Sequence, residues 1–186
     1  MTRIIAGRFG GRRLATPPGA GTRPTSDRVR EALFSSLEAS FGGLDGLAVV
    51  DLYAGSGALG LEAASRGARV VTLVEHDRRA ADVIRRNVRD LGVDAQVRAT
   101  TVDAWLASTT DVVDLAFLDP PYALDHDRLE AQLVALLPRL APDALVVVER
   151  SSRTPFAWPD GYAALRDKRY GETHVWQGEP SVGSVP

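Results

Sequence analysis

The sequence predicts an α/β fold: a mostly parallel seven-stranded sheet that ends in an antiparallel hairpin, preceded by a short basic N-terminal extension. Three observations support this prediction. Short apolar runs alternate with segments of helical periodicity, glycines follow the first apolar run at a strand-to-helix turn, and two strand-like segments close the chain. Alternating strands and helices argue for right-handed βαβ units around a parallel sheet.

The N-terminal part precedes this alternation. Residues 3–15 are glycine-rich and basic and suit a small hairpin, and residues 16–21 form a connector rich in proline and glycine. A helix is predicted from residue 26 or 27 to residue 39, because residues 25–27 offer capping side chains and apolar residues then recur at helical spacing.

The remaining elements follow in order along the chain. Strands are predicted near residues 47–52, 69–75, 95–100, 113–118 and 143–149, and helices near 59–66, 78–91, 102–108 and 126–137. The final hairpin pairs segments near 163–168 and 172–177. We therefore expect an extension over residues 1–24, one domain over 25–178 and a flexible tail over 179–186.

A short loop with two prolines follows the predicted strand 113–118. In it, the Asp119 carboxylate and the Pro120 carbonyl can point the same way as acceptors, because proline restricts its own backbone and that of the preceding residue. Tyr122 adds a flat surface beside them. This set suits a planar NH₂ group on a conjugated ring, whereas an ordinary turn with a capping Asp is the alternative.

A glycine-rich loop follows the first predicted strand. Gly55, Gly57 and Gly60 have the G-x-G-x-x-G spacing, which permits a tight turn and close approach of a ligand to the backbone. Glu75 ends the next strand, 20 residues after Gly55, where an acid can bind a ribose diol. Asp51 precedes the loop, and its carboxylate would repel the pyrophosphate of a dinucleotide. S-adenosylmethionine is cationic and has no phosphates, so it fits this loop better than NAD.

Together these motifs resemble class I S-adenosylmethionine-dependent methyltransferases, which have a Rossmann-like fold. The N-terminal segments 3–14 and 22–34, the second reading TRPTSDRVREALF, narrow the resemblance to the RsmD-type small-subunit ribosomal RNA guanine-N2 methyltransferases. The likeness runs from Arg3 to about Gln177. It implies methyl transfer from S-adenosylmethionine to the N2 amine of a guanine in 16S ribosomal RNA, guanine 966 in this family. It also implies a substrate within an assembled or partly assembled subunit.

The resemblance assigns roles to residues of this chain. Catalysis is assigned to Asp119, Pro120, Pro121 and Tyr122. Cofactor binding is assigned to Asp51, Tyr53, Ala54, Gly55, Ser56, Gly57, Glu75, His76, Asp103, Ala104 and Asp119. Asp103 can instead cap the helix 102–108, and Trp105 is expected in the core.

The charge distribution predicts contact with nucleic acid. Residues 1–30 contain seven arginines against Asp27 alone, whereas the whole chain carries a formal charge of −2. A basic segment on an acidic body is typical of proteins that bind nucleic acid. The residues expected to contact RNA are Arg3, Arg8, Arg12, Arg13, Arg23 and Arg28. Arg23 and Arg28 can alternatively close over the methionine end of the cofactor.

Composition excludes several classes of protein. The chain has no cysteine and three scattered histidines, so disulfides, thiolate catalysis and a metal site are not expected. No apolar run reaches the roughly 20 residues that span a bilayer, and the arginine-rich N-terminus lacks the apolar core of a secretory signal. We expect a cytoplasmic monomer.

Other functions remain open at this point. A DNA adenine-N6 methyltransferase would use the same proline loop but usually needs a target-recognition insert, and none is visible between residues 122 and 177. The basic extension argues against a protein-glutamine methyltransferase. A non-catalytic RNA-binding assembly factor is the alternative from another class, although the intact glycine and proline loops disfavour it.

Overall fold

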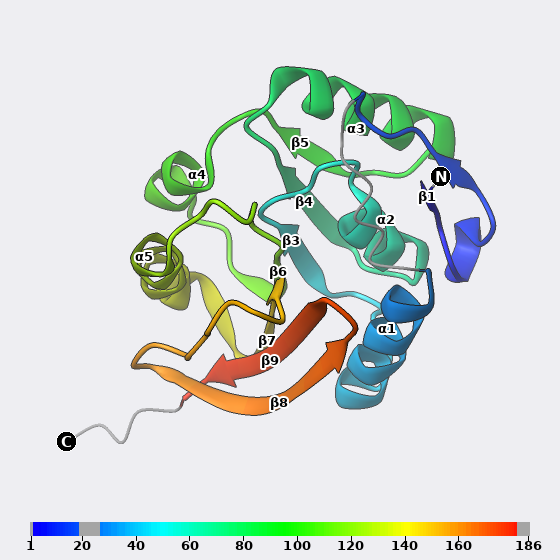
Figure 1. Cartoon of the computed structure of the whole chain (residues 1–186). Helices are drawn as coiled ribbons and strands as arrows, with labels where there is room; N and C mark the ends of the chain where they lie inside the picture. The colour runs from blue at the N-terminus through cyan, green and yellow to red at the C-terminus, as the bar shows by residue number, and fades with distance from the viewer. Residues whose placement is uncertain (1, 19–26, 182–186) are drawn as a thin grey trace.

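The computed structural model of the protein describes residues 2–18 and 27–181, and its centre is a seven-stranded sheet (Figure 1). The strand order is β5-β4-β3-β6-β7-β9-β8, with the first five strands parallel and the last two antiparallel to their neighbours. The strands are β3 (Ala48–Asp51), β4 (Val70–Val74), β5 (Gln96–Arg98), β6 (Val113–Leu118), β7 (Leu140–Ser151), β8 (Tyr162–Tyr170) and β9 (Thr173–Pro180). This topology confirms the predicted fold class.

Helices cover both faces of the sheet, with α4 and α5 on one side and α1 and α2 on the other (Figure 1). The helices are α1 (Asp27–Phe41), α2 (Ala58–Ser65), α3 (Arg78–Leu91), α4 (Val102–Ser108) and α5 (His126–Leu136), followed by the 3₁₀ turn η2 (Leu137–Arg139). Within the described part of the chain, none of them combines the length and the apolar composition that a membrane crossing requires.

The core has two halves because successive side chains of a strand point to opposite faces of the sheet. Val49 in β3 packs into the cluster under α1, α2 and α3, whereas its neighbour Val50 packs into the cluster under α4 and α5. In β6, Phe117 and Leu118 divide in the same way. Strands buried on both faces explain why the sequence shows continuous apolar runs rather than alternation.

Element boundaries differ from the sequence-based expectation mainly at the C-terminal strands. β7 begins at Leu140 rather than near residue 143, because Leu140 pairs with Val113 at the start of β6. β9 continues to Pro180, which pairs with Tyr162. Residues 179 and 180, expected in the tail, are thus part of β9. Residues 182–186 of the expected tail lie outside the described residues.

The N-terminal extension forms the expected hairpin. β1 (Thr2–Arg3) pairs antiparallel with β2 (Arg13–Leu14), and the 3₁₀ turn η1 (Gly7–Phe9) lies between them. Ile4 and Leu14 are buried in the same cluster as α1, α2 and α3. The hairpin is therefore part of the hydrophobic core.

Buried polar groups on α2 fix the hairpin in place. Glu62 is fully buried, and its carboxylate accepts hydrogen bonds from the backbone N–H of Ile5 (2.6 Å) and Ala6 (3.0 Å). Arg66 donates to the same carboxylate at 2.8 Å. Ser65 accepts from the Phe9 N–H at 2.9 Å. These bonds satisfy backbone groups that the short strands leave unpaired.

Candidate active site

Three adjacent strands bring the expected acidic residues to one edge of the sheet. β3 lies between β4 and β6, and Asp51 at its end pairs with Leu73 of β4 and Phe117 of β6. Glu75 and Asp119 each come two residues after those partners, so both lie just beyond the same edge. The predicted convergence is confirmed, at the carboxyl ends of strands where open α/β sheets bind ligands.

The glycine loop makes a tight turn from β3 into α2. Gly55 and Gly57 have positive φ angles of +57° and +82°, a conformation that residues with a side chain rarely adopt. Gly60 lets the helix approach the sheet, because a Cβ atom there would lie 2.4 Å from Leu73 Cδ2. The space beside Gly55 is open, since a Cβ atom at that position would meet nothing within 4 Å beyond its chain neighbours. The backbone there is accessible to a ligand.

Asp51 is an acid buried beneath this loop with only 1% of its surface exposed. Its Oδ2 accepts a hydrogen bond from the Gly60 N–H at 3.1 Å, whereas no hydrogen bond reaches Oδ1 from the described residues. Burial, with the nearby negative charge of Glu75, raises the pKa of Asp51 to about 7. An acid with an unused buried oxygen is suited to a cationic ligand that donates hydrogen bonds.

Glu75 connects the glycine loop to the end of β4. Its Oε2 accepts from the Gly55 N–H at 2.9 Å, and its Oε1 accepts from the Asp77 N–H at 2.8 Å. His76 Nδ1 lies 3.2 Å from Glu75 Oε1. A carboxylate has about four lone-pair sites, so these contacts leave Glu75 able to accept a further hydrogen bond from a ribose hydroxyl.

A cavity of about 210 Å³ opens beside Glu75. It is bounded by the ends of β3, β4, β5 and β6 and by α4 and α5, through Leu52, Tyr53, Val74, Glu75, His76, Thr100, Thr101, Val102, Asp103, Pro121, Leu124, Arg128 and Gln132. It therefore joins residues expected to bind the cofactor with one residue of the proline loop. Asp51, Ala104 and the residues of the glycine loop do not line it.

Asp103 does not cap α4. The cap is Thr101, whose hydroxyl accepts from the Ala104 N–H at 3.2 Å. Asp103 instead bonds to two residues of α5, Arg128 and Gln132, the latter donating at 2.8 Å. The hydrogen bond from Arg128 is the main reason that the pKa of Asp103 is lowered. Trp105 is buried, as expected.

Gln132 is a site residue that the sequence analysis missed. It is 2% exposed, and besides donating to Asp103 it accepts a hydrogen bond from the Tyr53 hydroxyl at 2.5 Å. It therefore links Tyr53, two residues after β3, to the start of α4. The available signal was a glutamine on the apolar face of α5, beside Leu129 and Leu133.

The proline loop leaves β6 and turns towards α5. The Leu124 N–H donates to the Pro121 carbonyl at 2.9 Å, which closes the turn. The buried Arg150 of β7 donates to the Leu124 carbonyl at 2.8 Å and so holds the far end of the loop. Tyr122 is 55% exposed. The loop thus presents an aromatic surface to solvent on a fixed backbone.

Two of the expected RNA-binding arginines form hydrogen bonds within the protein. Arg3 and Arg12 have partners within the protein: Arg3 donates to Asp27 at 2.7 Å, and Arg12 donates to the Asp90 carbonyl at 2.7 Å. Arg8 lies over the Phe9 ring at 5.3 Å. All three are exposed, as are Arg13 and Arg28. Arg23 lies outside the described residues.

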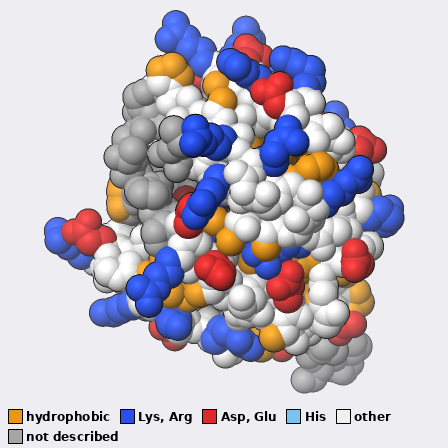
Figure 2. Space-filling model, turned by 90° about the vertical axis from the view of Figure 1, so that its right-hand side faces the viewer, with side chains coloured by type: hydrophobic (Ala, Val, Ile, Leu, Met, Phe, Trp, Pro, Cys, Tyr) orange, Lys and Arg blue, Asp and Glu red, His pale blue; other side chains and the backbone are white. Residues whose placement is uncertain are grey.

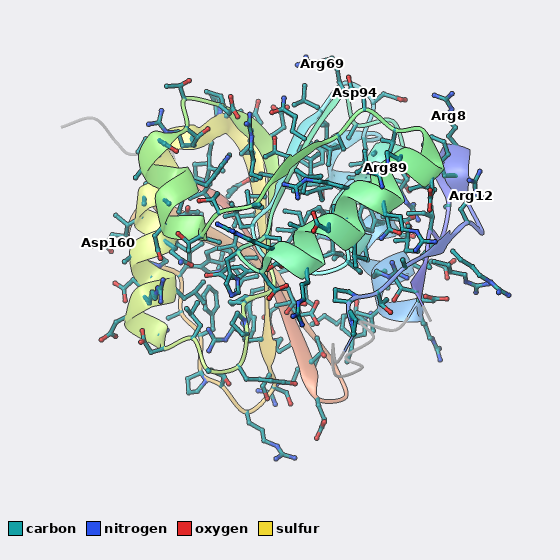
Figure 3. All side chains as sticks on the ribbon, turned by 90° about the horizontal axis from the view of Figure 1, so that it is seen from above. Arg8, Arg12, Arg69, Arg89, Asp94 and Asp160 are labelled. Carbon is teal, nitrogen blue, oxygen red and sulfur yellow. The ribbon has the colours of Figure 1, made fainter. Side chains whose placement is uncertain are left out.

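The N-terminal hairpin places two of these arginines, Arg8 and Arg12, at one side of the molecule (Figure 3). Arg8 and Arg12 project from the N-terminal hairpin near Arg89 of α3, and Asp160 lies at the opposite side (Figure 3). The side of the molecule that carries α1 and the hairpin shows many basic side chains, with acidic ones among them (Figure 2).

A buried asparagine connects the extension with the glycine loop. Asn87 of α3 is 2% exposed, accepts from the Ala15 N–H at 2.8 Å and donates to the Ala15 carbonyl at 2.9 Å. Its amide also donates to the Ser56 carbonyl at 3.0 Å. One side chain therefore sets the distance between the end of the basic hairpin and the expected cofactor loop.

Comparison with known proteins finds relatives that match nearly the whole chain. A family model described as conserved hypothetical protein 95 matches residues 2–178. The protein named ribosomal RNA small subunit methyltransferase D in Haemophilus influenzae is 35% identical over 177 residues, which cover 91% of this chain and 89% of that protein. The Escherichia coli K12 protein of the same name is 38% identical over 148 residues, covering 79% of this chain and 73% of that protein.

Solved structures share the architecture. The Escherichia coli protein YhhF superposes with a TM-score of 0.84 at 33% identity, covering 97% of this chain and 98% of that chain. The 16S rRNA N2 G1207 methyltransferase RsmC of Thermus thermophilus, solved with AdoMet and guanosine, superposes with a TM-score of 0.68 at 24% identity. It covers 89% of this chain and 45% of RsmC, and it shows that the fold is the one used by class I methyltransferases.

Proposed function

This chain belongs to the RsmD-type family of conserved hypothetical protein 95, and we propose that it methylates the exocyclic N2 amine of a guanine in small-subunit (16S) ribosomal RNA. The proposed methyl donor is S-adenosylmethionine, and the proposed target is guanine 966, the target in this family. We further propose that it acts as a cytoplasmic monomer on an assembled or partly assembled small subunit.

The observation that carries the proposal is the position of the proline loop. Asp119 follows β6, next to the β3 end that bears Asp51 and the glycine loop. A cofactor beneath the glycine loop and an amine held by the proline loop would therefore meet at one sheet edge. Membership of a family whose relatives are named for ribosomal RNA supplies the substrate class.

The residues present fit S-adenosylmethionine. The free Oδ1 of Asp51 can accept a hydrogen bond from a cationic ligand, Glu75 can accept the ribose hydroxyls, and the cavity beside Asp103 can hold the adenine. The open backbone at Gly55 permits close approach. When bound, this cofactor supplies an electrophilic methyl group on a sulfonium.

The proline loop would hold the guanine amine. The Asp119 carboxylate and the Pro120 carbonyl accept its two N–H bonds, which favours a pyramidal nitrogen whose lone pair points away from the ring. Tyr122 stacks on the base and fixes its plane. With the methyl group of a bound cofactor placed opposite this lone pair, Asp119 or water would take the proton that the amine releases.

Positioning should account for most of the rate acceleration. Correct orientation of two bound reactants can contribute roughly 7–11 kcal/mol, whereas general-base help is typically about 10²–10⁴-fold. The base must leave its stack to enter this loop, which is easiest in a single-stranded loop or bulge.

The direct test is methyl transfer from labelled S-adenosylmethionine to purified small ribosomal subunits, with total RNA, DNA and protein as parallel acceptors. Mass spectrometry of nucleosides identifies the product. We expect N2-methylguanosine in small-subunit RNA. N6-methyladenine in DNA would replace the proposal with the adenine methyltransferase alternative, and cofactor binding without any modified acceptor would contradict methyl transfer by the protein alone.

A further inference from the structure

We propose that the groove between α1 and the β8–β9 hairpin is a second RNA-binding site, which holds a single-stranded nucleotide that flanks the target base. This inference rests on the proposed function, because the RNA bound in the groove would be the strand that carries the methylated guanine. The groove has a volume of about 220 Å³, similar to that of the cavity at the active site.

The groove combines cationic, aromatic and polar side chains. Arg166 and Lys168 of β8 are both exposed and line it together with Tyr170. The Lys168 Nζ lies 5.2 Å from the centre of the Tyr170 ring. Ser36 and the buried Gln177 also line it and are hydrogen-bonded to each other. Proteins that bind single-stranded nucleic acid use this combination, with cations for the phosphates and an aromatic ring for base stacking.

Two contacts keep the groove in shape. Arg166 donates to the Ser36 hydroxyl of α1 at 2.9 Å, which joins the strand to the helix across the groove. Asp167 also lines the groove, and its carboxylate contacts His174 Nε2 at 2.6 Å, so part of its negative charge is engaged there. The groove therefore keeps a net positive charge from the side chains of β8.

Strand register places the groove next to the active-site edge. Leu118 of β6 pairs with Val148 of β7, and the next residue of β7, Glu149, pairs with Val175 of β9, which pairs with Lys168. Asp119 follows Leu118 and so lies level with Glu149, Val175 and Lys168 across the sheet. The distance from Asp119 to Lys168 is thus three strand spacings, about 14 Å. A strand of a few nucleotides can cover this distance from a base held at Asp119.

Charges on an edge strand also prevent sheets from pairing edge to edge, so charge alone does not identify an RNA site. The groove adds what that role does not need, because an aromatic ring lies beside the cations in a hollow of the surface. A role confined to protection against aggregation would leave substrate affinity unchanged when the charges are reversed.

The test compares two double variants on purified small ribosomal subunits. Arg166→Glu with Lys168→Glu alters the groove. Arg69→Glu with Arg139→Glu makes the same charge change at the amino ends of the parallel strands, away from the proposed active site. We expect the groove variant to raise KM roughly tenfold, to leave kcat and S-adenosylmethionine affinity unchanged, and to flatten the salt dependence of RNA binding by roughly 0.7 for each phosphate that is no longer bound. The control should match the wild-type protein.

Single variants guard against a folding defect. Lys168→Ala should give a smaller rise in KM with an unchanged melting temperature. Tyr170→Leu should raise KM without changing the salt dependence, because it removes stacking but no charge.

Three results would overturn the inference or its premise. Equal KM and salt dependence for the groove and control variants would overturn the inference. A rise in the KM of the groove variant on assembled subunits but not on protein-free ribosomal RNA would assign the groove to a protein partner instead. Absence of methyl transfer by the wild-type protein to any RNA would overturn the proposed function itself.

Discussion

Asp119 is the residue at which catalysis and cofactor binding can be separated. It belongs to the loop after β6, whereas the proposed cofactor contacts at Asp51 and Glu75 belong to the neighbouring strand ends. We predict that Asp119→Ala lowers kcat by at least about 10²-fold, since the amine loses an acceptor and a base. If Asp119 contacts only the amine, the Kd for S-adenosylmethionine should change less than twofold in calorimetry, whereas the cofactor contact that the resemblance also assigns to Asp119 would weaken it. Equal loss of turnover and cofactor affinity would contradict this assignment.

Asp51 should make cofactor binding depend on pH. Its pKa is raised to about 7, so below that pH the folded protein without ligand favours the protonated form. The stability that this protonation contributes is complete below the ordinary pKa of 3.8 and is lost as the pH rises through about 7. A cationic ligand favours the carboxylate. We therefore predict that affinity for S-adenosylmethionine falls below pH 7, by up to about tenfold per pH unit.

Calorimetry in two buffers of different ionisation enthalpy would detect the proton that is released on binding. Asp51→Asn removes the titrating group while keeping the shape of the side chain, so its binding should lose this pH dependence. The same slope in wild type and variant would show that another group titrates.

At the scale of elements, α2 anchors the N-terminal hairpin through one buried carboxylate. We predict that Glu62→Ala lowers the free energy of unfolding by about 3–5 kcal/mol, because it leaves the Ile5 and Ala6 N–H groups and the Arg66 guanidinium without this acceptor. Glu38→Ala is the matched control. Glu38 also pairs with Arg66 but its side chain is 39% exposed, so its loss should cost less than about 1 kcal/mol.

Thermal and urea unfolding measure both variants, and limited proteolysis reports whether the hairpin detaches. An unfolding free energy for Glu62→Ala that equals that of Glu38→Ala would show that the hairpin is held by Ile4 and Leu14 alone.

The elements themselves were largely predictable from the sequence, and the polar links between them were not. Apolar runs and capping residues depend on near neighbours, so α3 was predicted with the observed bounds, 78–91. The bonds of Glu62, Asn87 and Gln132 depend on which elements meet in space. Each is a polar residue on a helix face that would otherwise be apolar, and pattern alone does not say what it contacts.

Among the candidate site residues, the acids at strand ends were predictable because parallel strands share an edge. Asp103 was harder to assign, since its partners Arg128 and Gln132 come from α5. The expected adenine contact at Asp103 therefore remains a prediction, and no sequence pattern indicated that the two α5 residues lie beside it.

For the whole molecule, an uneven charge distribution should make RNA binding sensitive to salt. The net charge is −2, yet the arginines of the N-terminal hairpin gather on one side (Figure 3). We predict that Arg12→Ala with Arg13→Ala weakens binding to small-subunit RNA and flattens its salt dependence, by roughly 0.7 for each phosphate that these side chains neutralise. Filter binding at several salt concentrations measures the slope.

Arg69→Ala with Arg139→Ala removes the same charge away from the hairpin, where β4 and β7 begin, and serves as the control. An unchanged slope for the hairpin variant would show that its arginines serve the fold, as the Arg12 bond to Asp90 already does in part.

The docking of the hairpin also has a consequence for biosynthesis. Ala15 is separated from its partner Asn87 by 72 residues, and Ile5 from Glu62 by 57. At about 5–20 residues per second, the ribosome needs roughly 4–14 s to extend the chain from Ala15 to Asn87. During that interval the newly made N-terminus has its arginines but lacks Asn87, and for the first part of it lacks Glu62 as well. The nascent chain therefore emerges with a basic, undocked segment beside the RNA-rich surface of the ribosome that is making it.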